Sequence, residues 1–490
     1  MRIALVSAEV SPFAKTGGLG DVAAALARYL HKHGHDVRLF LPLYGKLDRA
    51  GQSFVPVSFL QDVPLTMGDR TFTYSVFAAP LPNSDLRIYF IACPPLYGRP
   101  AIYAQDGDEH VRFAFLCRAA IECCQRMGFS PNVFHVNDWH TALVPLYLKT
   151  LYKWDGLFAA TKTVLTLHNL GYQGGFPRER LADVGLRDFE SLLHQDELRA
   201  GRFSFMTTGL LYADALTAVS ETYAREIQTP EHGFGLDPIL RARSESVFGI
   251  VNGVDYDEWS PEKDSLIAAR FSASDLSGKE RCRRHLCAKF GVDDGAPVVG
   301  VVSRLTSQKG LELAAEVLPP RLAAGALRLV ALGSGAENLV DFFHGLARRF
   351  PRRVAFHEGY SNEIAHEIEA GADMFLMPSR FEPCGLNQMY SLRYGTLPLV
   401  RATGGLDDTV ENYDPYTGRG TGFKFWEASG PALIDTLRWA LRVYDHPEVW
   451  QRLQRAAMGS DFSWARSAAA YVEVYEAAIA RTGRRRAASR

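Results

Sequence analysis

The sequence lacks the marks of several large classes of protein. Its seven cysteines are odd in number and include no Cys-x-x-Cys pair, which argues against a disulfide framework or a cysteine metal site and favours reduced thiols. No apolar run reaches the roughly 20 residues of a membrane span, and no signal peptide precedes the first strand-like run. Because the net charge is only −1, neither nucleic acid nor a membrane surface is expected as a partner. We expect a cytoplasmic globular protein.

What the sequence does contain is an alternation of short apolar runs and helical patterns along most of its 490 residues. Such runs without polar alternation are typical of parallel strands buried on both faces. The predicted strands are 3–6, 37–41, 86–91, 133–136, 164–167, 215–219, 298–302, 327–332, 354–357, 374–377 and 397–400. The predicted helices include 22–33, 111–127, 141–152, 204–212, 311–318, 338–350, 363–370 and 386–393. This order predicts an α/β fold with doubly wound parallel sheets.

The pattern begins again near residue 298, after a turn-rich segment at 250–255. A chain of this length is expected to form two or three domains. We predict two Rossmann-like domains, at 1–245 and 246–460, followed at 461–490 by a C-terminal helix and a basic tail. The tail contains three consecutive arginines at 484–486 and is expected to be solvated.

Polar clusters follow the ends of eight predicted strands. They lie at 15–21, 137–140, 168–169, 303–310, 333–335, 359–361, 380–385 and 403–405. Ligands of open parallel sheets bind beyond the carboxyl ends of the strands. Two such sheets facing each other would form a deep cleft, so the sequence predicts a binding site between the two domains.

Two glycine-rich turns are candidate anion sites. Lys15–Asp21 and Thr403-Gly404-Gly405 each precede a helix start, where free N–H groups can point at a phosphate. An ordinary strand–helix turn explains either of them equally well. Gly333-Ser334-Gly335 is part of a dinucleotide fingerprint, but helix–strand packing would also explain it.

Charged side chains near these turns suggest the chemistry. Arg304 and Lys309 lie around one tight turn and could both reach a pyrophosphate, although a surface ion pair is the alternative. Asp138, His168 and Glu382 are the candidate reactive groups. A structural histidine and a helix-capping carboxylate are the simpler explanations for His168 and Glu382.

Other residues leave two interpretations open. Trp139 and Tyr360 could stack on a sugar or a base, or belong to the core. Asp-x-Asp pairs occur at 106–108 and 255–257, and such pairs can hold a divalent cation. Neither pair follows a strand of the predicted site, so no metal is expected.

Four motifs of the sequence together resemble those of a known family. They are Lys-Thr-Gly-Gly-Leu-Gly-Asp at 15–21, His-Asn-Leu-Gly-Tyr-Gln-Gly at 168–174, Ser-Arg-Leu-Thr-Ser-Gln-Lys-Gly at 303–310, and Pro-Ser-Arg-Phe-Glu-Pro-Cys-Gly-Leu at 378–386. Together with shorter matches at 137–140, 252–255 and 403–406, they resemble the bacterial glycogen synthases and plant starch synthases. The resemblance extends from the first strand to at least Val410.

This resemblance implies a GT-B fold and a retaining transfer of glucose from ADP-glucose to the non-reducing end of an α-1,4-glucan such as glycogen, without a cofactor. It implies that the sugar nucleotide is contacted by Lys15, Gly17, Gly18 and Asn169, its diphosphate by Arg304 and Lys309, and its adenine by Tyr360. It places Asp138, His168, Glu382, Cys384 and Gly385 around the glucosyl ring, and Thr403 and Gly404 at the distal phosphate. A Glu-x7-Glu motif common in related retaining enzymes is incomplete, because Tyr390 takes the second position.

Two questions stay open at this stage. Retention requires either a covalent intermediate, with Glu382 or Asp138 as nucleophile, or same-face attack guided by the departing phosphate. A nucleotide-sugar epimerase of the same fold and a non-catalytic glucan-binding protein are the alternative functions. The second is disfavoured by the joint presence of Arg304, Lys309 and Glu382.

Overall fold

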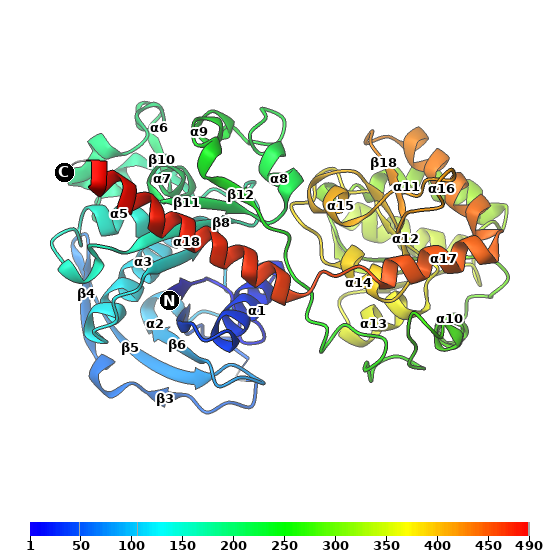
Figure 1. Cartoon of the computed structure of the whole chain (residues 1–490), viewed down its shortest axis with the longest axis horizontal. Coiled ribbons are helices and arrows are strands. Elements are labelled where there is room, and N and C mark those ends of the chain that lie inside the picture. Colours follow the sequence, from blue (N-terminus) through cyan, green and yellow to red (C-terminus); the bar gives the residue numbers. More distant parts are fainter. Residues whose placement is uncertain (49, 105, 489–490) are drawn as a thin grey trace. The chain divides into compact units, whose positions relative to one another are not determined.

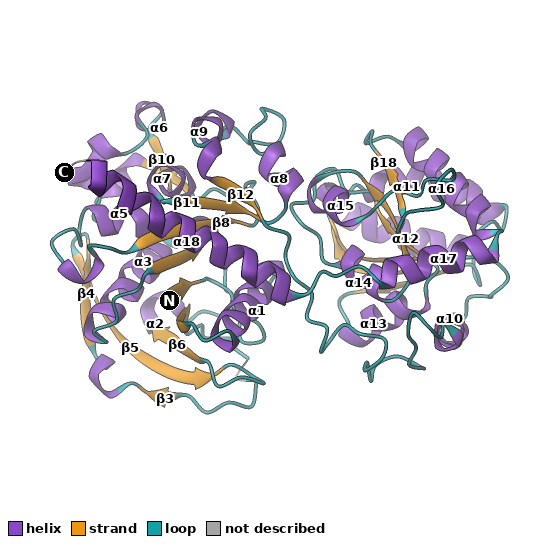
Figure 2. Cartoon of the chain, viewed as in Figure 1, coloured by secondary structure: helices purple, strands orange, loops and turns teal. Residues whose placement is uncertain are grey.

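The apolar runs of the sequence form two β-sheets with helices on their faces (Figures 1 and 2). They belong to a computed structural model that describes residues 1–48, 50–104 and 106–488, with side chains as far as Arg481. The chain divides into two compact units. Unit 1 comprises 1–219, 224–253 and the segment from Trp464 onward, and unit 2 comprises 220–223 and 254–463.

The main sheet of unit 1 has the strand order β12-β11-β8-β7-β1-β2-β6-β5-β3, with β4 paired to β5. From β12 to β6 all strands are parallel, and Ile3 of β1 lies between Val37 of β2 and Val133 of β7. The strands are β1 (Arg2–Val6), β2 (Asp36–Pro42), β3 (Val55–Pro56), β4 (Val63–Met67), β5 (Arg70–Pro80), β6 (Arg87–Ala92), β7 (Val133–Asn137), β8 (Lys162–Leu167), β11 (Ala215–Ala218) and β12 (Val247–Gly249), while β9 (Gly175–Pro177) and β10 (Arg202–Ser204) form a separate pair.

Antiparallel strands that the sequence did not predict, β3, β4 and β5, extend the parallel part of this sheet at one edge. In β5 the buried residues Phe72, Tyr74 and Val76 alternate with more exposed neighbours. A two-residue turn, Gly68-Asp69, joins β4 to β5, and Gly68 has a φ of +57°, which suits a tight hairpin. Strands with one exposed face do not contain the continuous apolar runs on which the predicted strands are based.

The sheet of unit 2 is entirely parallel, in the order β15-β14-β13-β16-β17-β18. Counted from its own first strand this is 3-2-1-4-5-6, the order of dinucleotide-binding domains, and ligands bind where the order reverses. Here that point lies between β13 and β16. The strands are β13 (Val298–Leu305), β14 (Arg328–Gly335), β15 (Val354–Glu358), β16 (Met374–Met377), β17 (Leu397–Arg401) and β18 (Phe423–Phe425).

Helices connect the strands and cover the faces of each sheet (Figure 2). In unit 1 they are α1 (Gly18–Lys32), α2 (Pro94–Tyr97), α3 (Glu109–Arg126), α4 (Asp138–Thr141), α5 (Val144–Lys149), α6 (Gln195–Arg199), α7 (Phe205–Tyr212), α9 (Asp237–Ala242) and α18 (Trp464–Ala488), and α8 (Glu221–Glu226) begins within 220–223. In unit 2 they are α10 (Ser277–Phe290), α11 (Leu311–Ala323), α12 (Glu337–Arg349), α13 (Asn362–Gly371), α14 (Asn387–Arg393), α15 (Gly404–Thr409), α16 (Gly430–Tyr444) and α17 (Pro447–Met458). The helix predicted at 141–152 is divided into α4 and α5, because Pro145, in the first turn of α5, has no N–H to continue the earlier helix.

The division between the units differs from the predicted boundary at 245/246. Residues 247–249 form β12, which pairs with β11 and extends the sheet of unit 1, so this unit continues to Gly253. At the other end, the chain rejoins unit 1 at Trp464, the first residue of α18. The side chains of the predicted basic tail at 484–486 lie outside the described residues.

The final helix, α18, packs on α1 and β8 of unit 1 (Figure 1, red ribbon). A buried chain of hydrogen bonds joins it to the sheet. The Tyr475 hydroxyl lies 2.6 Å from Nδ1 of His135 on β7, and Nε2 of His135 lies 2.6 Å from the hydroxyl of Thr166 on β8. Thr166 in turn lies 2.6 Å from the hydroxyl of Thr217 on β11. This series of hydrogen bonds thus connects the last helix to three neighbouring strands.

Candidate functional site

The turn after β1 already holds an anion, the carboxylate of Glu9. Glu9 is buried and accepts hydrogen bonds from the N–H groups of Thr16 (2.6 Å) and Gly17 (3.2 Å). It also accepts from the Thr16 hydroxyl at 2.7 Å and from the Tyr103 hydroxyl at 2.5 Å. Two N–H groups that the sequence assigned to a phosphate are therefore used internally. Gly18, the first residue of α1, stays exposed.

Lys15 projects from the same turn. Its ammonium forms an ion pair with Asp21 at 2.8 Å, and its side chain remains 42% exposed. Because Asp21 lies in the first turn of α1, the ion pair fixes Lys15 close to the helix start. The cation is thus held in position and still accessible to a ligand.

Asp138 begins α4 directly after β7 in a conformation that is unusual for its residue type. Its φ is +52°, in the left-handed region that favours glycine, and its side chain is buried. Oδ1 accepts hydrogen bonds from the N–H of His168 at 2.8 Å and from that of Asn169 at 3.4 Å. Burial, with a smaller contribution from the Glu9 carboxylate, raises the pKa of Asp138 to about 7.

His168 and Asn169 follow β8 and are brought next to Asp138 by the parallel pairing of β7 and β8. Nε2 of His168 lies 2.9 Å from Oδ1 of Asn137, and burial lowers the pKa of this histidine to about 3, so its ring is neutral at physiological pH. The side-chain oxygen Oδ1 of Asn169 accepts a hydrogen bond from Gly171 N–H at 3.0 Å. Asp138 and His168 thus lie together, as their positions after neighbouring strands predict.

Trp139 belongs to the core of unit 1. Its ring packs against Phe113 at 5.0 Å and His140 at 4.1 Å between ring centroids. A side chain at Gly174 would overlap the Trp139 ring, which shows how closely the backbone covers it. Of the two interpretations left open for Trp139, the structure supports the core.

In unit 2, Lys309 and Glu382 are in direct contact. Nζ of Lys309 lies 2.5 Å from Oε2 of Glu382, and the Ser379 hydroxyl donates to the same oxygen at 3.1 Å. Glu382 is buried and Lys309 largely so. The contact arises because the turn after β13 is hydrogen-bonded to the turn after β16, with Arg380 N–H donating to the Gln308 carbonyl at 2.9 Å.

Glycines allow these turns to approach one another. Gly310 has a φ of +63°, and a Cβ there would overlap the carbonyl oxygen of Pro378. Gly404 has a φ of +45° and lies equally close to the Glu382 carbonyl, which accepts a hydrogen bond from Gly405 N–H at 3.1 Å. The 403–405 turn therefore supports the backbone of the Glu382 loop, and one of its N–H groups is already engaged.

The other predicted residues of unit 2 line the same edge of its sheet. Arg304 is the penultimate residue of β13 and has an exposed side chain, and Tyr360 follows β15 with 72% of its surface exposed. Cys384 and Thr403 are buried, and Gly385 has a φ of +75°. The predicted site residues thus form two sets, each at the carboxyl edge of its own sheet. The set in unit 1 is Lys15, Gly17, Gly18, Asp138, His168 and Asn169, and the set in unit 2 is Arg304, Lys309, Tyr360, Glu382, Cys384, Gly385, Thr403 and Gly404.

The structure also explains two departures from known motifs. Gly333 and Gly335 lie within β14, where a Cβ would overlap carbonyl oxygens of β13, so strand packing accounts for them. Tyr390, at the position of the missing second carboxylate, stacks on Trp259 with ring centroids 3.8 Å apart and planes within 1°. It anchors α14 to the segment that follows residue 254.

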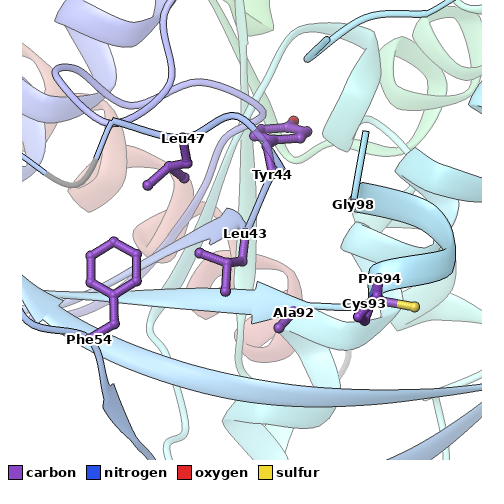
Figure 3. Close-up of a pocket in the computed structure, with 9 residues that line it drawn as sticks. Leu43, Tyr44, Leu47, Phe54, Ala92, Cys93, Pro94 and Gly98 are labelled. Atoms are coloured by element: carbon purple, nitrogen blue, oxygen red, sulfur yellow. The ribbon is translucent and has the colours of Figure 1, made fainter. Parts of the chain in front are cut away.

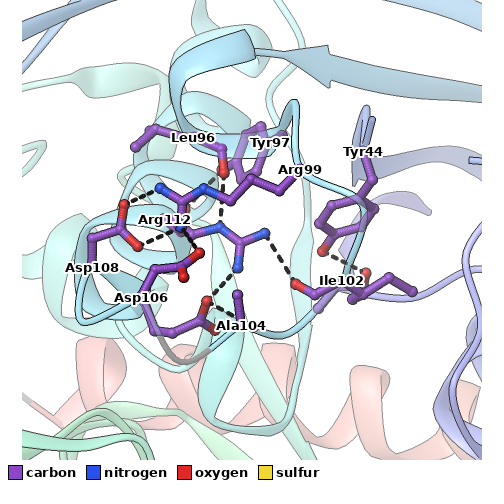
Figure 4. A network of polar contacts seen from close by, with 11 residues as sticks. Tyr44, Leu96, Tyr97, Arg99, Ile102, Ala104, Asp106, Asp108 and Arg112 are labelled. Carbon is purple, nitrogen blue, oxygen red and sulfur yellow. Dashed lines mark hydrogen bonds and ion pairs between the residues drawn. The ribbon is translucent and has the colours of Figure 1, made fainter. Parts of the chain in front are cut away.

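Both Asp-x-Asp pairs are engaged by cations of the chain. Arg99 forms ion pairs with Asp106, at 2.9 Å, and with Asp108 (Figure 4). In the second pair, Asp257 contacts Lys263 at 2.7 Å. In the described ranges, no group of three or more His, Cys, Asp or Glu side chains is arranged to hold a metal ion.

A small apolar pocket of about 230 Å³ lies beyond the ends of β2 and β6 (Figure 3). Leu43, Leu47 and Phe54 form one side of it, and Ala92 and Cys93 the other. Tyr44 forms part of the wall, and its hydroxyl donates to the Ala8 carbonyl at 2.9 Å, which links the pocket to the Glu9 turn. Its lining offers few groups to a phosphate, so the charged edge described above is the stronger candidate site.

Sequence reasoning missed two residues of this site, Glu9 and Ser379. Both are buried polar side chains next to a predicted residue, and each holds such a residue or its turn in place. A signal existed for Glu9, because a lone carboxylate directly after a buried strand has to find hydrogen-bond donors nearby. Ser379 gave none beyond its position in the 378–386 motif.

Comparison with known proteins identifies the family of this chain. A family model described as the starch synthase catalytic domain matches residues 2–242, and one described as glycosyl transferases group 1 matches 283–456. A glycogen synthase from Koribacter versatilis is 46% identical, with 98% of each chain covered. Glycogen synthase 1 from Geobacter sulfurreducens is 44% identical over 97% of this chain and 96% of its own.

Solved structures agree. The catalytic domain of starch synthase IV from Arabidopsis thaliana, bound to ADP and acarbose, superposes with a TM-score of 0.89 at 32% identity, covering 98% of this chain and 99% of its own. A sucrose-phosphate synthase from Thermosynechococcus elongatus matches at a TM-score of 0.58 and 16% identity, which reflects the fold alone. Across the residues that can be described, no helix is both long and apolar enough to cross a membrane.

Proposed function

Since this chain belongs to the family of glycogen and starch synthases, we propose that it transfers glucose from ADP-glucose to the non-reducing end of an α-1,4-glucan with retention of configuration. The observation that carries the proposal is the contact between Lys309 and Glu382 at the point where the strand order of unit 2 reverses. ADP is proposed as the nucleotide because the Arabidopsis relative is described as bound to ADP.

Lys309 and Arg304 would stabilise the leaving group. As the bond between glucose and the diphosphate breaks, negative charge develops on the departing oxygen, and fixed cations lower the energy of that state. Lys309 is held in place by Glu382 before any donor arrives. Its ammonium therefore needs no reorganisation during the reaction.

Glu382 acts in this proposal by positioning Lys309. Its carboxylate contacts Lys309 and the Ser379 hydroxyl through the same oxygen, Oε2, which makes it a weak candidate for a nucleophile. Asp138, with a pKa of about 7, is partly protonated at neutral pH and can accept or donate a proton near the sugar ring. Lys15, Gly17, Gly18 and Asn169 are proposed to contact the substrate from unit 1, and Tyr360, Cys384, Gly385, Thr403 and Gly404 from unit 2.

A labelling assay tests this function. The purified chain is incubated with glycogen and radioactive ADP-glucose or UDP-glucose, and the polymer is then digested with β-amylase. Labelled maltose from the ADP-glucose reaction would support transfer to non-reducing ends through α-1,4 links. A labelled isomeric sugar formed without glycogen would instead indicate an epimerase, and faster transfer from UDP-glucose would overturn the donor assignment.

We also propose that the reaction requires no metal ion, because Lys309 and Arg304 supply the cations that a diphosphate leaving group needs. We expect the same initial rate in buffer with EDTA as in buffer with Mg²⁺. Loss of activity in EDTA that Mg²⁺ restores would contradict this expectation.

A further inference from the structure

Unit 2 has a hollow on its surface, lined by a loop and a helix that the proposed reaction does not use. The hollow has a volume of about 590 Å³ and is bounded by the 411–420 segment and by Arg452 and Ala456 of α17. One aromatic ring stands out in its lining. Tyr416 is 98% exposed, more than any other large hydrophobic side chain in the described part of the chain.

The hollow lies away from the candidate reaction site. The 411–420 segment leads into the amino end of β18, where Asn412 forms a bridge with Gly422. Lys309 and Glu382 follow the carboxyl ends of β13 and β16. Because the sheet is entirely parallel, its amino and carboxyl edges are opposite, so a ligand in the hollow does not occupy the reaction site.

The loop that carries Tyr416 is held rigidly. The carboxylate of Asp414 accepts hydrogen bonds from Tyr416 N–H and from the Thr417 hydroxyl, both at 2.8 Å. The Asp414 backbone closes the turn, with its N–H donating to the Arg419 carbonyl and its carbonyl accepting from Gly418 N–H, both at 2.8 Å. The ring is therefore presented to solvent by a preformed turn, which lowers the entropy lost when a ligand binds.

Charged side chains surround the ring. Glu411, Arg419 and Arg452 line the hollow with exposed side chains, and no hydrogen bond or ion pair engages them within the residues that the structure describes. Guanidinium groups donate in a planar fork, and a carboxylate accepts, so together they can bind neighbouring hydroxyl groups. The flat face of Tyr416 can pack against an apolar surface between such hydroxyls.

We infer that this hollow is a secondary binding site for an α-1,4-glucan chain, with Tyr416 as the stacking platform and Arg452, Arg419 and Glu411 as hydrogen-bonding groups. The choice of glucan rests on the proposed function. The volume of the hollow lies in the range of sites for small ligands, so it can hold a few sugar units. A stable protein interface needs a larger surface, of over about 1,000 Å². A carboxylate in the lining disfavours a simple anion. A second site on the same polymer raises the effective concentration of chain ends near the reaction site.

Affinity electrophoresis of the full chain tests this inference. Native gels with and without glycogen measure how strongly the polymer retards migration, and therefore the dissociation constant. We expect Tyr416→Ala to weaken binding about tenfold, the loss typical of removing a central aromatic contact, and Tyr416→Phe to bind nearly as well as the wild type. Arg452→Ala should also bind more weakly. Trp154→Ala, which removes another exposed ring, at 76% exposure in unit 1, is the matched control and should migrate like the wild type.

Kinetics separate this site from the reaction site. With a short malto-oligosaccharide as acceptor, Tyr416→Ala should keep the wild-type rate, whereas with glycogen its KM should rise. Unchanged retardation of Tyr416→Ala by glycogen would overturn the inference. The inference would also be overturned if light scattering showed that the wild type is a dimer and that Tyr416→Ala is a monomer, because the hollow would then bind a second copy of the chain. An equal loss of retardation in Trp154→Ala would overturn it as well. If the wild type binds glycogen through Tyr416 but transfers no glucose, the inference stands and the proposed function fails.

Discussion

Lys309 lies four residues beyond the end of β13 and Glu382 five residues beyond the end of β16, and the interaction between them depends on how the two turns meet. Neither residue would be held in place by its own turn alone. The backbone hydrogen bond from Arg380 to Gln308 and the close approach of Gly310 to Pro378 bring the two side chains together. A single substitution at this pair should therefore have a large effect on activity.

We predict that Lys309→Ala lowers kcat by 100-fold or more, about the cost of losing one preorganised donor to a developing negative charge. Lys289→Ala is a matched control, because Lys289 pairs with the buried Glu367 at 2.8 Å, outside the predicted site. Both variants leave a carboxylate without its cation, so a comparable loss of stability is expected in each. Activity should fall only in the first, as measured by initial rates of glucan labelling. Comparable activity in the two variants would contradict the assignment.

The residues of the candidate site differ in how far sequence could predict them. Asp138 and His168 follow neighbouring parallel strands, so their proximity follows from strand order alone. Strand order alone does not place Glu9, because one of its hydrogen-bond donors, Tyr103, lies 94 residues further along the chain. The phosphate site predicted in this turn is partly filled by Glu9, because its carboxylate accepts from the N–H groups of Thr16 and Gly17. A pattern of glycines shows that N–H groups are available, and only the folded chain shows which acceptor they meet.

At the scale of whole elements, α18 has a structural role that burial alone does not reveal. Its Tyr475 supplies the hydrogen-bond partner of Nδ1 on His135, a side chain with no exposed surface in the middle of the sheet. His135 is two residues before Asn137, which contacts His168. The helix therefore supports a strand that carries part of the candidate site.

We predict that Tyr475→Phe destabilises unit 1 by about 1–3 kcal/mol, because it keeps the ring and leaves a buried nitrogen without its partner. Chemical denaturation followed by tryptophan fluorescence would measure the change. A second substitution, His135→Leu, removes the unpaired nitrogen, so the double variant should lose less than the sum of the two single variants. Additive losses would mean that the hydrogen bond contributes nothing.

Elements with both faces buried were predicted well from sequence, and those with one exposed face were not. The runs at 3–6 and 298–302 that became β1 and β13 are apolar throughout, the run at 133–136 that became β7 is apolar except for His135, and the positions of all three are confirmed. The β4–β5 hairpin was missed because its apolar residues alternate with polar ones, although Gly68-Asp69 is a recognisable turn signal. The break between α4 and α5 is explained by Pro145, whose missing N–H cannot continue a helix.

For the whole molecule, the predicted α/β class with two Rossmann-like units of the GT-B type is confirmed by the two sheets and by the starch synthase match. The sheet of unit 2 is parallel throughout, whereas the sheet of unit 1 adds antiparallel strands at one edge. The boundary at 245/246 missed β12, a three-residue strand too short to give a periodic signal. The long elements thus allowed the fold class to be predicted from the sequence pattern, whereas the end of unit 1 depends on a short strand, β12.

Buried titratable groups in unit 1 make its stability depend on pH. Burial lowers the pKa of His135 and of His140 from 6.5 to about 3, so an unfolded chain binds two protons below pH 6.5 that the folded chain does not. Stability from these groups is therefore lost as the pH falls. Asp138 opposes them, because its raised pKa lets the folded chain hold one proton between pH 3.8 and about 7.

We predict a net loss of roughly 1.4 kcal/mol per pH unit from these three groups between pH 6 and 4, which corresponds to one proton. His168 adds to this loss in the same direction. Asp138→Asn removes the opposing proton and should steepen the fall by about one further proton. Urea titrations at pH 6, 5 and 4 would measure both slopes, with His357→Gln, which alters an exposed ring, as a control. A slope that Asp138→Asn leaves unchanged would contradict the assignment of a raised pKa to Asp138.

The return of α18 to unit 1 has a consequence for the order in which the molecule can be completed during translation. Apart from 220–223, unit 2 is one continuous stretch, 254–463, and can close as soon as that stretch has left the ribosome. The sheet of unit 1 is synthesised first, yet Tyr475 is added more than 200 residues after β12, the last strand of that sheet. Until then His135 has no partner on Nδ1. The unit that begins synthesis first is thus the last to finish folding.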